Sequence, residues 1–491
     1  MSARSSSASD RSRWLTLAAV AVGVFMTTLD NTVVNVALPS IQRDLHLSLS
    51  GLAWVVNGYV LSFAVLLLTG GRLADTFGRR RLFLGGLAGF IVASVVAGLA
   101  PSEGALIAAR VLQGAAAALM TPPTLAIISH TFTDERQRST AIGIWAAVTA
   151  AAFAVGPLAG GVITANVHWT WIFFVNVPIG ILGLLFGARF IPESRDPQAD
   201  RRIDFAGVGL ISGSLFSLTY ALIKANDLGW GSTTILGLLA ASAVMLAGFV
   251  AVERRVHAPM VDLSVLRSRR FTVANIIVLV FTLATFGVLL YTSLYLQDVV
   301  GEGPVAAGAA LLPWVAMVII FAPVVGAIGD RLPVQWLATA GLVLLGIAML
   351  LFAGLGEHST FLERMPALAL GGLGGAMLSG LSNVAISAVP VEQSGVASGV
   401  HNTFRETGGS FGVAIIGAVF ATASSHAATG GATPKHAFVS GYSAGLTVGA
   451  IIVFAAAGLA ATMLGDRPPA LLRRVSRAVV PGARATAETP A

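Results

Sequence analysis

The sequence predicts an all-helical integral membrane protein, and three observations lead to that prediction. Hydrophobic residues make up 55% of the 491 residues, charged residues only 11%, and the mean hydropathy is +0.82. A soluble domain cannot hide so much apolar surface, because its own surface must stay polar. The apolar residues are also gathered into runs as long as the hydrocarbon core of a bilayer. Finally, the arginines are concentrated in alternate loops between these runs.

Fourteen apolar runs follow one another at regular intervals. Each is close to the roughly 20 residues that a membrane-spanning helix needs. The first run is too long for a signal-peptide core and lacks a small-residue cleavage site, so we interpret it as a retained helix. The predicted spans are residues 14–38, 52–69, 82–100, 104–129, 140–163, 170–191, 205–223, 233–252, 271–296, 304–328, 337–356, 364–389, 398–423 and 438–463.

The positions of arginine and lysine predict the orientation in the membrane. With a cytoplasmic N-terminus, 24 of the 30 basic residues fall on the cytoplasmic side and four on the other side. The remaining two, Arg110 and Arg405, lie inside spans. We therefore expect both termini in the cytoplasm, and the pI near 10.5 requires no nucleic-acid partner. The bias of 28 Arg to 2 Lys is typical of a GC-rich bacterial genome, so we expect a bacterial plasma membrane.

An internal repeat divides the chain. The segment "GRLADTFGRRR" (residues 71–81) follows the second run, and a divergent copy, "GAIGDRL" (residues 326–332), follows the tenth. The second bundle then begins at the ninth run, which predicts six helices, two inserted helices and six more, a parallel repeat found in transporters. The inserted pair is interpreted as a lipid-facing spacer. The predicted parts are a cytoplasmic tail (1–13), the first bundle (14–191), a linker with the inserted helices (192–270), the second bundle (271–463) and a cytoplasmic tail (464–491).

Several motifs occur in a characteristic order. They are "LDNTVVNVALPSI" in the first span, "GRLADTFGRRR" after the second, "RVLQG" in the fourth, "GPLAGG" in the fifth, "WTWIFFVNVPIG" at the sixth, "RRIDFAG" before the seventh and "YLQDVVGEGPVAAGAALLP" between the ninth and tenth. In this order they resemble the major facilitator superfamily, in particular its fourteen-helix drug:proton antiporter family. The resemblance covers Trp14 to Leu464. It implies two six-helix bundles that rock around a central cavity.

Asp30 and Arg110 are charged residues inside apolar spans. At about 1.5 Å per residue, Asp30 lies roughly 12 Å and Arg110 roughly 9 Å from the same side of the membrane. The spans that carry them line the cavity in this superfamily, so we expect the two charges to pair, since either alone would be costly. Intramembrane charges usually mark ion pathways, which predicts that Asp30 takes up a proton when the pair loosens. The alternative is a static ion pair that only fixes helix packing.

Two glycine-containing motifs have mechanical interpretations. In residues 71–81, Asp75 can hold a helix N-terminus of the opposite bundle through its dipole. The resemblance implies that this loop is a conformational latch, with Gly71, Asp75, Gly78, Arg79 and Arg80. The fifth span combines small residues with a proline, which permits a close and bent helix contact. The resemblance implies that this second motif accompanies antiporters, and its residues are Gly156, Pro157, Gly160 and Gly161.

The thirteenth span carries a polar cluster, "HNTFRETGGS". Arg405 and Glu406 are adjacent and point about 100° apart, so we expect only one of them to face the cavity. Glu406 is the second candidate for proton contact, and snorkelling of both residues to the inner surface is the alternative. A cavity with few charges and many aromatic groups suits bulky, amphipathic, often cationic substrates. The candidates for substrate contact are Met26, Asn57, Gln113, Tyr291, Tyr295, Trp314, Phe404 and Arg405.

Enzyme chemistry finds no support in the sequence. There is no cysteine, the eight histidines are scattered, and no G-x-x-x-x-G-K-[ST] phosphate loop occurs. We therefore expect a monomer without enzymatic activity, metal or cofactor, in contact with lipids and driven by the proton gradient. The predicted function is efflux of hydrophobic or amphipathic drugs or antibiotics in exchange for protons. Two alternatives are a dedicated natural-product exporter that gives self-resistance and a non-transporting membrane sensor, which would not need Asp30 and Arg110.

Overall fold

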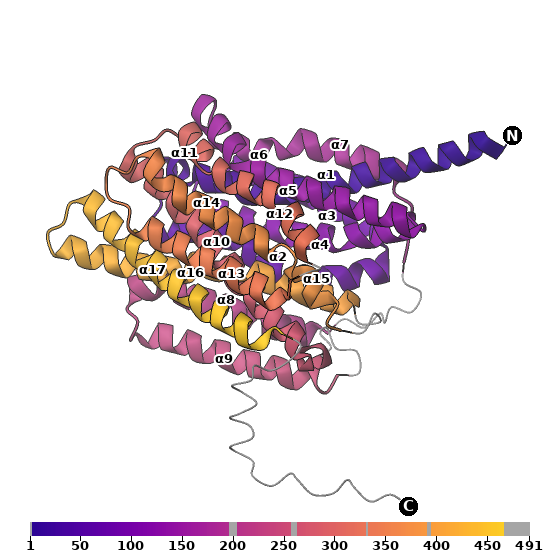
Figure 1. Cartoon of the computed structure of the whole chain (residues 1–491). Coiled ribbons are helices and arrows are strands. Elements are labelled where there is room, and N and C mark those ends of the chain that lie inside the picture. Colours follow the sequence, from indigo (N-terminus) through magenta and orange to yellow (C-terminus); the bar gives the residue numbers. More distant parts are fainter. Residues whose placement is uncertain (1, 196–203, 257–262, 330–331, 390–393, 466–491) are drawn as a thin grey trace, which may run out of the picture.

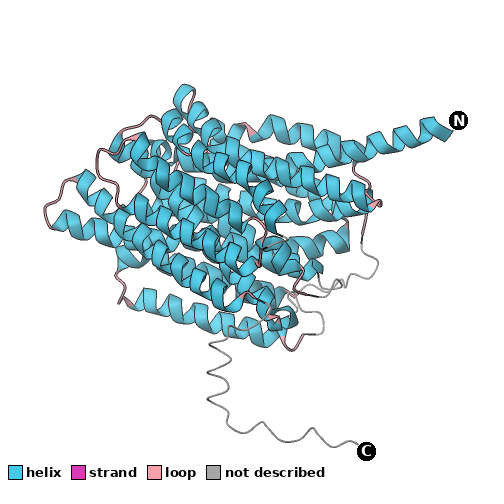
Figure 2. Ribbon diagram, viewed as in Figure 1, coloured by secondary structure: helices cyan, strands magenta, loops and turns pink. Residues whose placement is uncertain are grey.

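The computed structural model describes residues 2–195, 204–256, 263–329, 332–389 and 394–465, and this part of the chain is built almost entirely of helices (Figure 2). In it, 14 helices are long and apolar enough to cross a membrane, and each overlaps one predicted span. The predicted C-terminal tail lies outside the described residues except for residues 464 and 465, and so do residues 330–331 of the divergent repeat.

The first bundle contains the first six spans. α1 and α5 pack together, as do α2 and α4, α3 and α4, and α1 and α7. The sixth span is broken into α6 and α7 because Pro178 has no N–H to continue the helix past Phe174. The helices are α1 (Ser2–Leu45), α2 (Leu49–Phe77), α3 (Arg79–Gly98), α4 (Glu103–Thr131), α5 (Glu135–Asn166), α6 (Trp171–Phe174) and α7 (Asn176–Phe190).

The second bundle repeats these pairings. α10 packs on α16, α12 on α14, α13 on α14, and α10 on α17, in the positions that correspond to the four pairs above. The elements are η1 (Leu263–Arg267), α10 (Arg269–Leu294), the π-helix η2 (Tyr295–Val300), α11 (Pro304–Ala310), α12 (Leu312–Gly329), α13 (Val334–Ala353), α14 (Phe361–Leu378), α15 (Leu381–Ile386), α16 (Ser394–Thr429) and α17 (Pro434–Met463). The repeat predicted from the sequence is therefore a repeat of structure.

The long helices lie roughly parallel to one another (Figure 1). We call the end that carries Arg79, Arg189 and Arg269 the basic end, and the end that carries Leu45 and Asn166 the far end. α1 begins at the basic end and is helical from Ser2, so residues 2–13 of the predicted tail continue the first helix. No glycine or proline interrupts residues 2–22, which explains why the helix extends beyond the apolar run.

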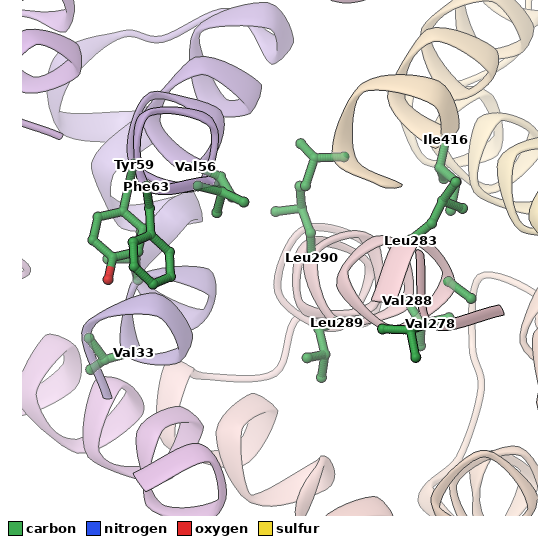
Figure 3. Close-up of a cluster of buried hydrophobic side chains, with 14 of the residues drawn as sticks. Val33, Val56, Tyr59, Phe63, Val278, Leu283, Val288, Leu289, Leu290 and Ile416 are labelled. Carbon is green, nitrogen blue, oxygen red and sulfur yellow. The ribbon is translucent and has the colours of Figure 1, made fainter. Parts of the chain in front are cut away.

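The two bundles meet along α2 and α16, α5 and α11, and α1 and α10. At the far end, a Cβ on Gly161 would collide with the backbone of Pro304, and a Cβ on Gly308 with the carbonyl of Pro157. Only glycine permits backbones to approach so closely. Gln297 also donates a hydrogen bond to the Val36 carbonyl at 2.9 Å. The bundles are therefore in tight contact at the far end, and buried apolar side chains of α2 and α10 lie near this seam (Figure 3).

Toward the basic end, α5 separates from its neighbours. Ile142, Gly143, Ile144, Ala146 and Ala147 are all exposed. At about 100° per residue these positions cover an arc of about 200°, slightly more than half of the helix circumference. The two bundles are thus in close contact at the far end, whereas α5 is widely exposed toward the basic end.

The inserted helices α8 (Phe205–Leu228) and α9 (Thr233–Glu253) form a hairpin, and α8 packs on α2 and on α16, one helix from each bundle. Trp54 of α2 packs against the rings of Phe216 and Tyr220, with centroids 5.7 Å away in both pairs. Lys224 donates to Ser50 at 2.9 Å and to Asp227 at 2.8 Å, and this hydrogen bond lowers the pKa of Asp227. α8 therefore joins the two bundles, which the interpretation as a spacer did not include, although most of the surface of α8 and α9 stays exposed.

Candidate functional site

Asp30 lies on α1 inside the first bundle with a side chain that is 0% exposed. Its Oδ2 accepts a hydrogen bond from Nη1 of Arg110, so the two charges form a direct ion pair. Its Oδ1 accepts from Nε2 of Gln113 at 3.1 Å and from Nδ2 of Asn176 at 2.9 Å. All three partners are donors, which is the environment that an ionised carboxylate requires. The structure therefore holds Asp30 as a carboxylate.

Arg110 is held from several sides and is only 1% exposed. Besides Asp30, its Nε donates to the carbonyl of Val55 at 3.1 Å, and its Nη1 donates to Oε1 of Gln113 at 3.0 Å. Its guanidinium carbon lies 4.4 Å from the ring centroid of Tyr59, a cation–π distance. The Tyr59 hydroxyl points toward α1 (Figure 3) and donates to the carbonyl of Thr27 at 3.2 Å. The charge pair thus links α1, α2 and α4.

Two members of this site were not predicted from the sequence. Ser94 of α3 accepts from Gln113 at 2.9 Å and from Asn176 at 3.4 Å, and it is completely buried. Asn176 is the first residue of α7, next to the break that Pro178 introduces. Each is a single polar residue inside an apolar span, and this sequence pattern is the signal from which they could have been predicted. They bring α3 and α7 into a network that the sequence confined to α1 and α4.

The small residues of the fifth span serve two contacts. A Cβ on Gly156 would collide with Thr32 of α1, and a Cβ on Gly160 would lie 2.5 Å from the carbonyl of Val33. Gly161 and Pro157 instead contact α11 of the second bundle. The motif therefore joins the helix that carries Asp30 to the far-end contact between the bundles.

The loop of residues 71–81 binds within its own bundle. Asp75 accepts from Nε of Arg79 at 2.9 Å, and the Arg79 N–H donates to the carbonyl of Ser194 at 2.9 Å. The Arg80 N–H donates to Glu193 at 3.2 Å, and its guanidinium donates to the carbonyl of Ala188. Asp75 was expected to hold a helix of the opposite bundle, but it lies in the last turn of α2, where a carboxylate faces the negative end of the helix dipole and pairs with Arg79.

The two glycines of this loop differ in role. Gly78 has φ +116°, in the region that favours glycine, and it separates α2 from α3. A Cβ at Gly78 would also lie 2.6 Å from Glu193. A Cβ on Gly71 would lie 3.5 Å from Pro122 of α4, an ordinary van der Waals distance, so a methyl group would fit there. Only Gly78 is required by the backbone.

In the second bundle, Arg405 and Glu406 of α16 form an ion pair of 2.8 Å. The two side chains bend toward each other although they leave the helix in different directions, and the expectation that only one of them faces the cavity stays a prediction. The side chain of Arg405 is 42% exposed and that of Glu406 only 9%. One turn further along, Ser410 donates to Asn57 of α2 at 2.5 Å. Glu406 also interacts electrostatically with Tyr59, so this face of α16 lies toward the Asp30 site.

The candidates for substrate contact are not gathered at one cavity. Gln113 belongs to the Asp30 network, and Asn57 lies at the seam between the bundles. Met26 is completely buried, with its Cε 3.1 Å from the Cβ position of Gly180 on α7. Phe404 is partly buried against the core, and Arg405 is the most exposed of the group.

Three aromatic candidates lie in the packed interior of the second bundle. Tyr291 stacks on Phe420 at 5.2 Å, and Tyr295 on Tyr442 at 4.8 Å. Trp314 is 3% exposed and packs against Gly371 of α14. Aromatic residues on a membrane helix can face lipid, cavity or core, and the sequence pattern alone does not distinguish these positions. Here all three face the core.

Two cavities lie elsewhere. One, of about 580 Å³, lies between the tip of the α8–α9 hairpin and the far ends of α16 and α17, and includes Trp230 and His426 in its lining. The other, of about 350 Å³, lies at the far ends of α1 and α5 and is lined by Arg43, Asp44 and Trp169 among others. Neither includes a predicted substrate residue. Within the described residues, no group of three or more His, Asp or Glu is arranged to hold a metal ion.

Two structurally repeated six-helix bundles that meet along one seam, with a buried charge pair inside the first bundle, define a membrane transporter of the alternating-access class. The sequence model of the Major Facilitator Superfamily matches residues 20–413. The chain belongs to this superfamily.

Curated relatives extend the comparison. The chain is 39% identical to the tetracenomycin C resistance and export protein of Streptomyces glaucescens over 410 residues, 83% of this chain and 76% of that protein. It is 35% identical to the puromycin resistance protein pur8 of Streptomyces alboniger over 482 residues, 96% and 95% of the two chains. A crystal structure of an auto-inhibited POT family peptide transporter superposes with a TM-score of 0.67 at 16% identity, covering 94% of this chain and 99% of that one. This last similarity concerns the fold alone.

Proposed function

We propose that the protein exports hydrophobic or amphipathic antibiotics or drugs across the plasma membrane of a bacterium in exchange for protons. The relatives support export, since their names describe resistance to tetracenomycin C and puromycin. A further relative, 38% identical, is the multidrug resistance protein Stp of Mycobacterium tuberculosis. The protein acts as a monomer, needs no cofactor, and takes its energy from the proton gradient.

The distribution of arginine supports the orientation. The basic end carries the arginine-rich loops, so the positive-inside rule places it, with both termini, in the cytoplasm. The exposed part of α5 around Ile142 and Ala146 then lies on the cytoplasmic side, where we infer an opening between the bundles, and the contact between α5 and α11 closes the outer side. In this state substrates enter from the cytoplasm or the inner leaflet.

The observation that carries proton coupling is the Asp30 site. A carboxylate with 0% exposure, paired with Arg110 and bound only by donors, is costly to separate from Arg110 unless a proton replaces that partner. Outward opening separates α5 from α11 and shifts α1, which packs on α5. Asp30 then loosens from Arg110 and is protonated from outside, and the return inward releases the proton. One charge crossing is worth about 2.3 kcal/mol per 100 mV.

The other charged motifs have supporting roles in this cycle. Glu406 extends the electrostatic site across the seam through Tyr59. The loop with Asp75 and Arg79 latches the basic end when the bundles close there. The glycines of the fifth span transmit the motion of α5 to α1.

A dedicated exporter of one natural product is the second candidate. It is supported by relatives named for single antibiotics, among them a probable actinorhodin transporter of Streptomyces coelicolor, 34% identical. The two proposals share one mechanism and differ in the breadth of substrates.

The test measures proton-driven accumulation of a substrate panel in inside-out vesicles. Wild-type protein is expected to accumulate one or several amphipathic compounds and to lose this on addition of a protonophore. Asp30→Asn is expected to bind substrate without coupled accumulation. Unimpaired exchange by that variant would remove Asp30 from the proposed role, and accumulation of a single compound would favour the dedicated exporter.

A further inference from the structure

Two amide side chains donate to the same oxygen of Asp30, but they are not held alike. Gln113 is bound at both ends: its Oε1 accepts from Arg110 at 3.0 Å, and its Nε2 donates to Asp30 and Ser94. Asn176 is bound at one end only, because its Nδ2 donates to Asp30 and Ser94 while its Oδ1 has no partner. Gln113 is therefore fixed in one orientation, and Asn176 is not.

The Oδ1 of Asn176 is an unusual atom. The residue is 0% exposed, and a buried carbonyl oxygen normally accepts at least one hydrogen bond. The neighbouring polar side chains, Asp30 and Ser94, accept hydrogen bonds from the Asn176 nitrogen, and none of them donates to its oxygen. While Asp30 is ionised, its carboxylate has no hydrogen to donate to this oxygen.

Protonation of Asp30 reverses the requirement. The proton adds to a carboxylate oxygen and forms an O–H bond, so an acceptor becomes a donor that needs an acceptor of its own. Arg110 can only donate, and Gln113 directs its oxygen to Arg110 and its nitrogen to Asp30, so it presents no acceptor to Asp30. Among the groups that contact Asp30, the oxygen of Asn176 is the one that is not yet used.

We propose that Asn176 is a positioning residue for the proton-binding reaction: its amide rotates when Asp30 is protonated, so that Oδ1 accepts a hydrogen bond from the carboxylic acid. A rotation of roughly 180° about the last side-chain torsion is sufficient, since that torsion has a broad energy profile. The Ser94 hydroxyl can donate as well as accept, so it remains a partner of the rotated amide. This inference rests on the proposed function, because it assigns a partner to the protonated state of Asp30.

The surroundings leave room for this assignment. The charged or titratable side chains that face Asp30 are Arg110 from α4 and Tyr59 from α2, and Glu406 of α16 lies within electrostatic range of Tyr59. The Tyr59 hydroxyl is committed to the Thr27 carbonyl. From α3 and α7 only the neutral groups Ser94 and Asn176 reach the site. No second acid or histidine among the described contacts of Asp30 competes for its proton.

The experiment is pH-difference infrared spectroscopy of the purified full chain in lipid. Acidification of the wild type should produce a carboxylic-acid band that is absent in Asp30→Asn. In Asn176→Leu, a change of similar size, the acid loses its acceptor and the band should shift to higher wavenumber. Ser94→Ala, which leaves Asn176 in place, is the matched control and should shift it less. Isotope-labelled asparagine in wild-type protein supplies a second readout without a core variant: a side-chain carbonyl band should change on acidification and stay unchanged in Asp30→Asn.

The outcomes separate the two ideas. An Asp30 band that keeps its position in Asn176→Leu, or a labelled asparagine band that does not respond to acid, overturns the role of Asn176 alone. A wild type without any Asp30-dependent band overturns the proton switch itself, and the role of Asn176 falls with it. If Asn176→Leu does not fold, the labelled wild-type protein decides the question.

Discussion

Replacing Arg110 with methionine removes one partner of a fully buried ion pair and leaves the other. The side chains are similar in volume, so the loss is mainly electrostatic. Arg110 is 1% and Asp30 0% exposed, which places the pair among those whose disruption costs about 3–5 kcal/mol. We expect Arg110→Met to lower the free energy of unfolding by an amount in this range.

The double variant Arg110→Met/Asp30→Asn should be more stable than Arg110→Met. It removes the unpaired charge and leaves only the loss of the bonds that Arg110 makes to Val55 and Gln113. At about 1 kcal/mol for each such bond, the remaining cost is about 2 kcal/mol. The second substitution therefore restores about 1–3 kcal/mol of the loss.

The assay is unfolding of the purified protein in detergent micelles, followed by circular dichroism at acidic and at alkaline pH. The defect of Arg110→Met should be larger at alkaline pH, because in acid a proton can neutralise the unpaired Asp30 and the folded variant then binds more protons than the unfolded chain. The reasoning is refuted if Arg110→Met is as stable as the wild type, or if the double variant is no more stable than the single one.

Three further predictions follow from other contacts. The chain has no native cysteine, so Asn57→Cys/Ser410→Cys, placed where the two side chains are 2.5 Å apart, should cross-link the bundles. Oxidation should then block transport and a reductant restore it; transport that continues in the cross-linked protein would show that this contact does not open. Trp54→Ala removes two aromatic pairs with α8, each worth about 0.5–1.5 kcal/mol, and should lower the unfolding free energy by about 1–3 kcal/mol. Trp336→Ala, at a 57% exposed position, is the control. If the two variants lower the unfolding free energy equally, the packing of Trp54 against α8 does not stabilise the protein. Gly78→Ala should lower the unfolding free energy by about 1–3 kcal/mol because of the φ of +116° at this position, whereas Gly71→Ala should leave it nearly unchanged. Unfolding in detergent micelles, as above, compares the two variants.

The transmembrane architecture could be read from the sequence because a bilayer imposes local requirements. Each span must be long and apolar by itself, whatever it packs against, so all 14 spans were found without knowledge of their neighbours. The pairing of Asp30 with Arg110 followed for a similar reason. Two charges at one depth have few other ways to be satisfied in an apolar medium.

The rest of the site depended on side-chain directions that no local pattern specifies. Ser94 and Asn176 reach Asp30 from α3 and α7 only because the bundle brings four helices together at one depth. Tyr291, Tyr295 and Trp314 turn into the core of their bundle, and Arg405 bends toward its neighbour Glu406. In a membrane every helix is apolar on most sides, so hydrophobic periodicity says little about which face meets lipid, cavity or core.

The sequence by itself thus determined the number of spans, the arginine asymmetry, the repeat and the acid at the centre of the site, because bilayer thickness and the cost of buried charge act on each segment separately. Only the tertiary structure decided which hydrogen-bond donors surround that acid, which end of the molecule is closed, and that α8 crosses the seam between the bundles. These features arise from contacts between segments far apart in the chain, where close packing and directional hydrogen bonds select one arrangement among many of equal hydrophobicity.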